Sequence, residues 1–289
     1  MKLVSFNYLL PATLTLSIAY WAAIRWQSYF ILHPTRLAKT HQFEFEHDQD
    51  FEELFFKNTA KNLYINAIYF KTKLIPSNGL VFYLHGNAGN IQKSGQLATD
   101  FTNIGYDVLM IDYRGFGKSQ GHCTSAEQMH EDVQWIYEQV LQMYAYNEDE
   151  IIVYGRSLGS GMATKLAADN KPKSLVLETP FCSVADVAQK YIKILPLRFW
   201  EKKLRFNFEN NRQVPDIQCP IYIFQGTKDK IVPYHSAEKL KPLLSEKSYF
   251  VTIEGGNHHN LRDFLEYNHY LNHFLNEQES LVPPQLISN

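Results

Sequence analysis

Gly155-Arg156-Ser157-Leu158-Gly159 is a G-x-S-x-G pentapeptide that lies between a strand-like run and a helical pattern. The run before it, Glu150 to Tyr154, is typical of a buried strand. A serine at the tip of a strand-to-helix turn has a strained backbone, which requires small residues two positions before and two positions after it. Gly155 and Gly159 meet this requirement, so Ser157 is the predicted nucleophile. Apolar residues then recur at helical spacing: Met162, Ala163, Leu166, Ala167 and Ala168.

A turn rich in glycine and asparagine, His85-Gly86-Asn87-Ala88-Gly89-Asn90, follows another strand-like run, Leu80 to Leu84. Turns of this kind leave backbone N–H groups free to point at a ligand. The turn at Ser157 places the amide of Leu158 at a helix N-terminus, where a negative charge is favoured. The backbone N–H groups of Asn87 and Leu158 are therefore the predicted oxyanion hole.

An acid and a base follow two further strand-like runs. Asp229 comes after Ile221 to Phe224, and His258 comes after Phe250 to Ile253. A neutral imidazole can take the serine proton near physiological pH, and a buried carboxylate can hold the ring in the required tautomer. The chain order Ser157, Asp229, His258 is the order of an α/β-hydrolase triad. We predict these three as the catalytic residues.

Two other residues remain alternatives for the base and the acid. His259 directly follows His258 and competes with it as the base. Glu178 stands at the end of a predicted strand and competes with Asp229 as the acid, because the motif allows either carboxylate.

Four blocks together resemble one branch of the α/β-hydrolase superfamily, which includes membrane-anchored hydrolases and palmitoyl-protein thioesterases. The similarity extends from about Gln42 to Phe274, and it implies a Ser-Asp-His hydrolase with Ser157, Asp229 and His258 at the triad positions. The family's histidine block usually reads G-x-H-N-D, whereas this chain has Gly256-Asn257-His258-His259-Asn260, which keeps His259 a competitor. The four blocks are His85 to Asn90, Asp112 to Ser119, Gly155 to Gly159 and Gly226 to Asp229.

The composition indicates one ordinary globular core. The chain has 289 residues, of which 45% are hydrophobic and 20% charged, and its net charge of -2 carries no signature of nucleic-acid binding. The sequence predicts no cofactor, because the G-K-S at Gly117 to Ser119 lacks the first glycine of a phosphate loop. It predicts no metal, because His269 and His273 have only Glu266 near them. Cys123, Cys182 and Cys219 follow no metal or disulfide spacing and are interpreted as free thiols.

The N-terminus is apolar and uncharged from Val4 to Ile24. About 20 apolar residues are enough to cross a bilayer, so we predict a transmembrane anchor over residues 1–24 and a single-pass membrane localisation. Lys2 precedes the run, and Arg25 follows it. A cleaved signal sequence is the alternative, although no clear cleavage site ends the run. Which side of the membrane the enzyme faces is left open.

Residues 25–41 are interpreted as a connector, and residues 42–276 as an α/β-hydrolase domain. Alternating strands and helices predict an α/β fold with a mainly parallel sheet and helices on both faces. A capping box at Thr124 to Glu127 marks the start of a helix from Ala126 to Met143, and residues 277–289 form a flexible tail. The expected strands are Phe43 to His47, Phe51 to Lys57, Leu63 to Lys71, Leu80 to Leu84, Asp107 to Ile111, Ile151 to Tyr154, Ser174 to Leu177, Ile221 to Phe224 and Tyr249 to Ile253.

Residues 181–216 are predicted to form a small helical cap, because they fit neither pattern. Their basic side chains outnumber their acidic ones, which favours anionic headgroups at the outer face of the cap. The underside is expected to supply an apolar acyl pocket. The apolar residues of this segment include Ile194, Leu195, Leu197, Phe199, Trp200, Phe206 and Phe208.

The sequence therefore predicts a membrane-anchored serine hydrolase that cleaves carboxylic esters or thioesters. A small molecule or an acylated substrate is the expected partner, and nucleic acid is not. Two alternatives stay open, namely a catalytically silent binding or scaffold protein with the same fold and a small peptidase, since the same machinery cleaves amides. The sequence does not choose the acyl group, the leaving group or the oligomeric state.

Overall fold

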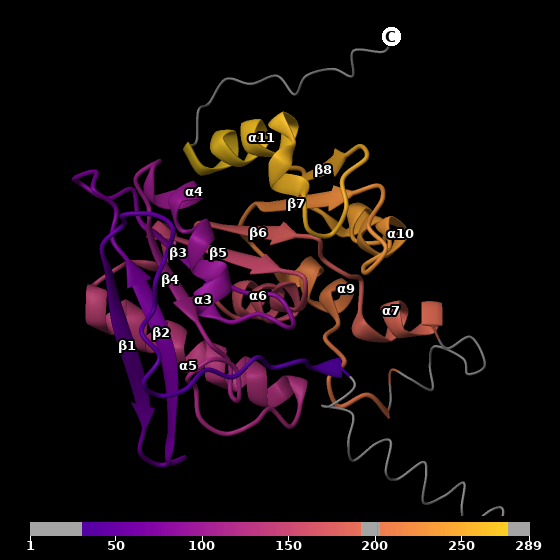
Figure 1. Ribbon diagram of the computed structural model, residues 1–289. Coiled ribbons are helices and arrows are strands. Elements are labelled where there is room, and N and C mark those ends of the chain that lie inside the picture. The colour runs from indigo at the N-terminus through magenta and orange to yellow at the C-terminus, as the bar shows by residue number, and fades with distance from the viewer. Residues whose placement is uncertain (1–30, 192–200, 202, 277–289) are drawn as a thin grey trace, which may run out of the picture.

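The computed structural model describes residues 31–191, 201 and 203–276. Their centre is a sheet of eight strands in the order β1-β2-β4-β3-β5-β6-β7-β8 (Figure 1). The β1–β2 and β2–β4 pairs are antiparallel, and all other neighbouring pairs are parallel, which confirms the predicted mainly parallel sheet. The strands are β1 (Phe51–Asn58), β2 (Leu63–Phe70), β3 (Leu80–Leu84), β4 (Asp107–Ile111), β5 (Ile151–Arg156), β6 (Ser174–Glu178), β7 (Ile221–Gly226) and β8 (Tyr249–Ile253).

Helices cover both faces of this sheet (Figure 1). Helices α5, α6 and α9 lie on one face with a core that contains Met129, Met162 and Phe208. Helices α3, α4 and α11 lie on the other face with Ile91, Phe101 and Tyr267. The helices are α3 (Ile91–Ser94), α4 (Thr99–Thr102), α5 (Ala126–Tyr144), α6 (Leu158–Asp169), α7 (Val184–Tyr191), α9 (Asn210–Gln213), α10 (Tyr234–Glu238) and α11 (Leu265–Asn276), with 3-10 turns η1 (Gly95–Leu97), η2 (Glu148–Glu150), η3 (Val214–Asp216), η4 (Lys241–Leu243) and η5 (Leu261–Asp263).

The central strands form because their side chains are buried on both faces. All five residues of β3, β4 and β6 are buried. Strands covered on both faces show continuous apolar runs instead of alternation, and this is why the sequence predicts them well. The boundaries of β3, β4 and β8 agree with the sequence prediction residue by residue.

Helix α5 begins one residue later than the predicted capping box implies. Ser125 is the N-cap residue, and its hydroxyl accepts a hydrogen bond from the backbone N–H of Gln128 at 3.2 Å. The side chain of Gln128 in turn accepts from the N–H of Thr124 at 2.9 Å. Gln128, at the third helical position, is therefore the side chain that completes the cap, in place of the predicted Glu127.

The predicted strand from Phe43 to His47 is wrong, because this segment is irregular. Its backbone is bonded by side chains: Glu44 N–H donates to Gln92 Oε1 at 3.3 Å, and Glu46 N–H donates to Gln96 Oε1 at 2.8 Å. The aromatic ring of Phe45 packs within 5.1 Å of the Phe51 ring. Alternating aromatic residues mimic a strand here, although they serve to cover the face of β1 and β2.

Part of the predicted cap belongs to the hydrophobic core. Phe206 and Phe208 are fully buried with α5 and α6, so these two side chains do not line an open acyl pocket, and that expectation is corrected. A Cβ atom on Gly161 of α6 would lie 2.6 Å from the Cβ atom of Phe208, which shows how closely the segment packs. Residues 192–200 of the predicted cap, with five of its seven named apolar residues, lie outside the described residues, and the domain boundaries stay a prediction.

The predicted membrane anchor, residues 1–24, also lies outside the described residues, as does the tail 277–289. Within residues 31–276 as described, no helix has the length and apolar character needed to cross a membrane. The three cysteines, Cys123, Cys182 and Cys219, have free thiols. The same residues contain no cluster of three or more side chains that could hold a metal ion.

We predict that His130 makes folding weaker in acid. His130 lies in α5 against the ring of Phe208, at 5.3 Å between centroids, and burial lowers its pKa from 6.5 to about 4. Below about pH 6.5 His130 is protonated in the unfolded chain, whereas in the folded protein it becomes protonated only near pH 4. The free energy of unfolding should therefore fall with pH across this window, at up to ~1.4 kcal/mol per pH unit from this group.

Urea unfolding of the wild type and of His130→Gln, measured from pH 7.5 down to pH 4, checks this prediction. The wild type should lose stability relative to the variant as the pH falls, and the difference should stay constant above about pH 7. Parallel stability curves over the whole range would contradict it.

Candidate active site

Ser157 stands at the turn between β5 and α6, with φ 51° and ψ −114°. A positive φ is rare outside glycine and costs about 1–3 kcal/mol, so the surrounding packing must hold it. A Cβ atom on Gly155 would lie 2.5 Å from the Ala163 Cβ, and one on Gly159 would lie 2.0 Å from the Leu84 carbonyl oxygen. The two glycines of the motif are thus required because neighbouring chain occupies the space of a side chain.

The three predicted triad residues are in contact. The Nε2 atom of His258 lies 3.0 Å from Ser157 Oγ, and its Nδ1 atom lies 2.7 Å from Asp229 Oδ2. The side chain of Asp229 is fully buried, and that of His258 is 8% exposed. Residues from three separate loops at the carboxyl ends of β5, β7 and β8 therefore meet in one chain of hydrogen bonds.

The loop after β7 orients the carboxylate of Asp229. Its Oδ1 atom accepts hydrogen bonds from the backbone N–H groups of Ile231 and Val232, both at 2.9 Å, which leaves Oδ2 to face His258. A Cβ atom on Gly226 would lie 2.3 Å from the Gly256 carbonyl oxygen, so glycine lets this loop touch the loop of the histidine.

The two alternatives occupy different surroundings. His259 is exposed, and burial together with the charge of His258 lowers its pKa. In the described part of the chain its ring forms no hydrogen bond with Ser157 or Asp229. The carboxylate of Glu178 is turned to Arg156 and Arg262 and makes no contact with the ring of His258.

The turn after β3 lies directly beside Ser157, because a Cβ atom on Gly86 would be 3.4 Å from the Ser157 Cβ. Among the described residues, the backbone N–H groups of Asn87 and Leu158 have no hydrogen-bond acceptor. Both predicted oxyanion donors are therefore free to bind a ligand, and the start of α6 places the positive end of its dipole nearby.

The segment from Ile31 to Arg36, which the sequence predicts to be part of a connector, belongs to this site. The side chain of Asn87 donates to the Ile31 carbonyl at 2.6 Å and accepts from the His33 N–H at 2.8 Å. Arg36 forms a parallel bridge with Gly117. No sequence motif marks this segment, because Asn87 binds only its backbone groups, which every residue type has.

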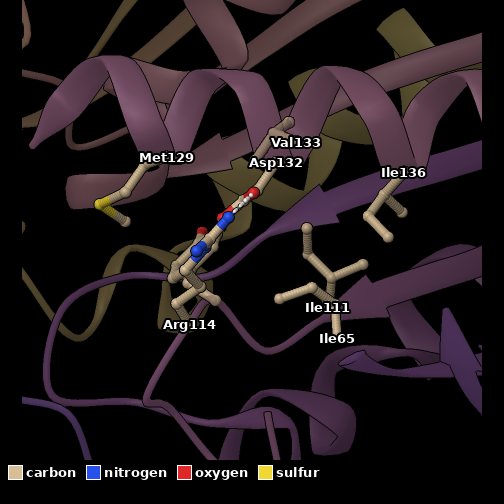
Figure 2. A pocket seen from close by; sticks show the side chains of 8 residues that line it. Ile65, Ile111, Arg114, Met129, Asp132, Val133 and Ile136 are labelled. Carbon is tan, nitrogen blue, oxygen red and sulfur yellow. Dashed lines mark hydrogen bonds and ion pairs between the residues drawn. The ribbon is translucent and has the colours of Figure 1, made fainter. Parts of the chain in front are cut away.

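Asp112 and Arg114, behind this turn, make contacts that stabilise loops. Asp112 Oδ1 accepts from the Ile91 N–H at 2.9 Å and lies 3.3 Å from His85 Nε2, with both side chains buried. Figure 2 shows Arg114 paired with Asp132 of α5, where Nη2 lies 2.7 Å from Oδ1, next to a cavity of about 10 Å³. A cavity of this size holds about one water molecule, so it is no substrate pocket.

A family model of serine aminopeptidases (S33) matches residues 75–205. The match contains Ser157 and ends before Asp229 and His258. An uncharacterized protein of Mycobacterium tuberculosis is 28% identical over 200 residues, which cover 69% of this chain and 70% of that protein.

Characterised relatives include lysophosphatidylserine lipases named ABHD12. The protein of Danio rerio is 29% identical over 202 residues, or 63% of this chain and 51% of the relative, and that of Gallus gallus is 29% identical over 194 residues, or 61% and 50%. The chain therefore matches about half the length of these lipases.

Solved structures share the fold. The esterase Pf2001 of Pyrococcus furiosus superposes with a TM-score of 0.66 at 17% identity, covering 85% of this chain and 97% of the esterase. Est1E of Butyrivibrio proteoclasticus, with ferulic acid bound, superposes with a TM-score of 0.62 at 20% identity, covering 75% of this chain and 96% of Est1E.

The sheet order, the strained serine turn and the loops at the carboxyl edge define an α/β-hydrolase fold. Together with these relatives, they make the chain similar to the serine hydrolases of the α/β-hydrolase superfamily. Esterases and lipases are the enzymes that it resembles.

Proposed function

We propose that this protein is a membrane-anchored serine hydrolase that cleaves a carboxylic ester or thioester through an acyl-enzyme on Ser157. The observation that carries the proposal is the contact of Ser157 Oγ with His258 Nε2 at 3.0 Å, which continues to Asp229 at 2.7 Å. A nucleophile bonded to a base, whose other nitrogen is bonded to a buried carboxylate, is the arrangement that activates a serine.

In the proposed reaction, His258 accepts the proton of Ser157 as Oγ attacks the carbonyl carbon of the substrate. The backbone N–H groups of Asn87 and Leu158 stabilise the negative oxygen of the tetrahedral intermediate. His258 then returns the proton to the leaving alcohol or thiol, and the acyl group stays on Ser157. Water, deprotonated by the same histidine, releases the acid in a second round. Asp229 keeps its negative charge throughout and stabilises the imidazolium.

The names of the relatives favour lipid esters among the substrates. The ABHD12 relatives are named lysophosphatidylserine lipases, which points to the ester of a lysophospholipid, and the neighbour Pf2001 is named an esterase. We therefore propose an ester with one acyl chain as the substrate class. The aminopeptidase model makes a short peptide the competing candidate, because an amide passes through the same intermediate.

The proposal predicts that Ser157→Ala abolishes labelling by a fluorophosphonate probe while the protein stays folded. Ser245→Ala is the matched control, because Ser245 is exposed on a loop before β8 and should label like the wild type. Mass spectrometry of the labelled peptide reads the site. Labelling that persists in folded Ser157→Ala would refute the nucleophile.

A substrate panel then separates the classes. We expect p-nitrophenyl esters and monoacyl glycerophospholipids to be cleaved by the wild type, with acyl thioesters as a second arm and aminoacyl amides as the peptidase arm. Cleavage of the amides alone would reject the esterase, and a folded wild-type protein that neither labels nor cleaves any of them would favour the silent binding protein.

His258 is proposed as the base, so His258→Ala should lower kcat by roughly 10³-fold or more, as for other triad members. His259→Ala is the natural control, because the two rings are neighbours at 5.2 Å and only His258 contacts Ser157. Steady-state kinetics on the best ester compares them. A larger loss in His259→Ala would reverse the assignment.

The anchor at residues 1–24 is proposed to remain attached. The described chain begins at Ile31, whose carbonyl is bonded to Asn87, so a preceding anchor would hold the carboxyl edge of the sheet close to the bilayer. Mass spectrometry of the protein extracted in detergent from membranes reads the mature N-terminus. We expect it before Val4, and a start beyond Ile24 together with activity in the soluble fraction would refute the anchor.

A further inference from the structure

Glu178 is a buried carboxylate that the proposed reaction does not use. It ends β6 and is 1% exposed. Its Oε1 atom lies 2.9 Å from Arg156 Nε in an ion pair, and its Oε2 atom accepts a hydrogen bond from Arg262 Nη2 at 2.8 Å. The hydroxyl groups of Tyr154 and Tyr267 also donate to Oε2, the latter at 3.1 Å. Every oxygen of this carboxylate is therefore engaged, and it cannot orient a histidine ring as a triad acid would.

The arginine next to the nucleophile joins this carboxylate to the histidine loop. Arg156 forms an ion pair through Nε with Glu178 and donates a hydrogen bond through Nη2 to the backbone carbonyl of His258 at 3.2 Å. The two contacts use different nitrogens of one planar guanidinium, which a lysine ammonium on a flexible stem does not reproduce. Burial opposes the charge of Arg156, but the carboxylate of Glu178 outweighs it and raises the pKa of Arg156, so the guanidinium stays charged.

The same carboxylate also holds the far end of the histidine loop. Arg262 belongs to the 3-10 turn η5, four positions after His258, and it pairs with both Glu178 and Asp100 of α4. The loop thus has a charged contact at His258 and a second one at Arg262. Two guanidinium groups face two carboxylates, so the network is balanced in charge although it is largely buried.

Glu178 also holds the nucleophile turn through its backbone. Its carbonyl oxygen accepts the N–H of Ser157 at 2.9 Å. One residue of β6 is therefore bonded to Ser157 by its main chain and to the loop of His258 by its side chain, with Arg156 between them. The distance between the serine and histidine loops depends on this residue.

We propose that Glu178 is a positioning residue which, through Arg156 and Arg262, keeps His258 within reach of Ser157. The inference rests on the proposed roles of Ser157 and His258. Because proton transfer requires close contact, a shift of about 1 Å in the histidine can cost on the order of 10²-fold in rate, even when the altered residue never touches the substrate. The charged network would then act on the chemical step and leave substrate binding unchanged.

The test uses the full-length protein with Arg156→Ala, Glu178→Gln and the double variant. Arg114→Ala is the matched control, because Arg114 is also an arginine in a two-bond pair with a carboxylate but has no bond to the histidine loop. The readouts are kcat and KM on the best ester, the rate of fluorophosphonate labelling, and the downfield proton resonance of His258 Nδ1, which reports the bond to Asp229 without any turnover.

We expect Arg156→Ala to lower kcat and the labelling rate by about 10²-fold with KM nearly unchanged. The His258 Nδ1 resonance should weaken or shift, and added guanidinium ion should restore part of the rate. Because Glu178 acts partly through Arg156, the fold-loss of the double variant should be smaller than the product of the two single losses. Arg114→Ala should retain both rate and resonance.

A folded Arg156→Ala protein whose labelling rate and Nδ1 resonance match those of Arg114→Ala would overturn the inference. Should Glu178→Gln fail to fold, Arg156→Ala carries the test, since 24% of the Arg156 side chain is exposed. A failure of the proposed function gives a different result. In that case the wild type would not be labelled at Ser157, but the Nδ1 resonance of His258 would still show whether Arg156 positions the histidine.

Discussion

The close approach of α6 to the end of β3 is the constraint on which the rest of the site depends. Gly159 touches the backbone of Leu84, where a methyl group would lie 2.0 Å from the carbonyl oxygen. This contact forces Ser157 into its positive φ, and it brings the free N–H of Leu158 to the turn that carries Asn87. The buried residues of α6 provide the packing that holds this strained turn, because most of the helix faces the core.

Two carboxylates at the carboxyl edge of the sheet, Asp229 and Glu178, have different surroundings that suit them to different roles. Asp229 has one oxygen held by backbone N–H groups and presents the other to the ring of His258. Glu178 is enclosed by two guanidinium groups and two phenols, so its charge is balanced by permanent cations. The first arrangement suits a partner that gains and loses a proton, and the second suits a fixed structural charge.

The N-terminal segment connects this chemistry to the predicted location of the protein. Asn87 uses the nitrogen and the oxygen of its side-chain amide to bind Ile31 and His33. The turn that carries the proposed oxyanion donor is therefore also attached to the chain that follows the predicted anchor.

The sequence by itself determined the elements whose information is local. Continuous apolar runs mark β3 and β4 because these strands are buried on both faces. The glycines around Ser157 mark a turn that only small residues permit. Similar runs place Asp229 and His258 after strands, which is enough to propose a triad. A local pattern also gave one wrong prediction. The aromatic alternation from Phe43 to His47 resembles a strand, but the backbone N–H groups of Glu44 and Glu46 in this segment donate to the side chains of Gln92 and Gln96.

Only the tertiary structure decided which charged and polar groups meet. Glu178 and Asp229 are equivalent in the sequence, as acids near the ends of neighbouring strands, and the packing of Arg156 and Arg262 around one of them separates their roles. His258 and His259 are adjacent, and the loop geometry alone turns one ring to Ser157 and the other to solvent. These contacts join residues about 20 to 100 positions apart, and no local pattern encodes them, because long-range pairing depends on how the whole sheet and its loops pack.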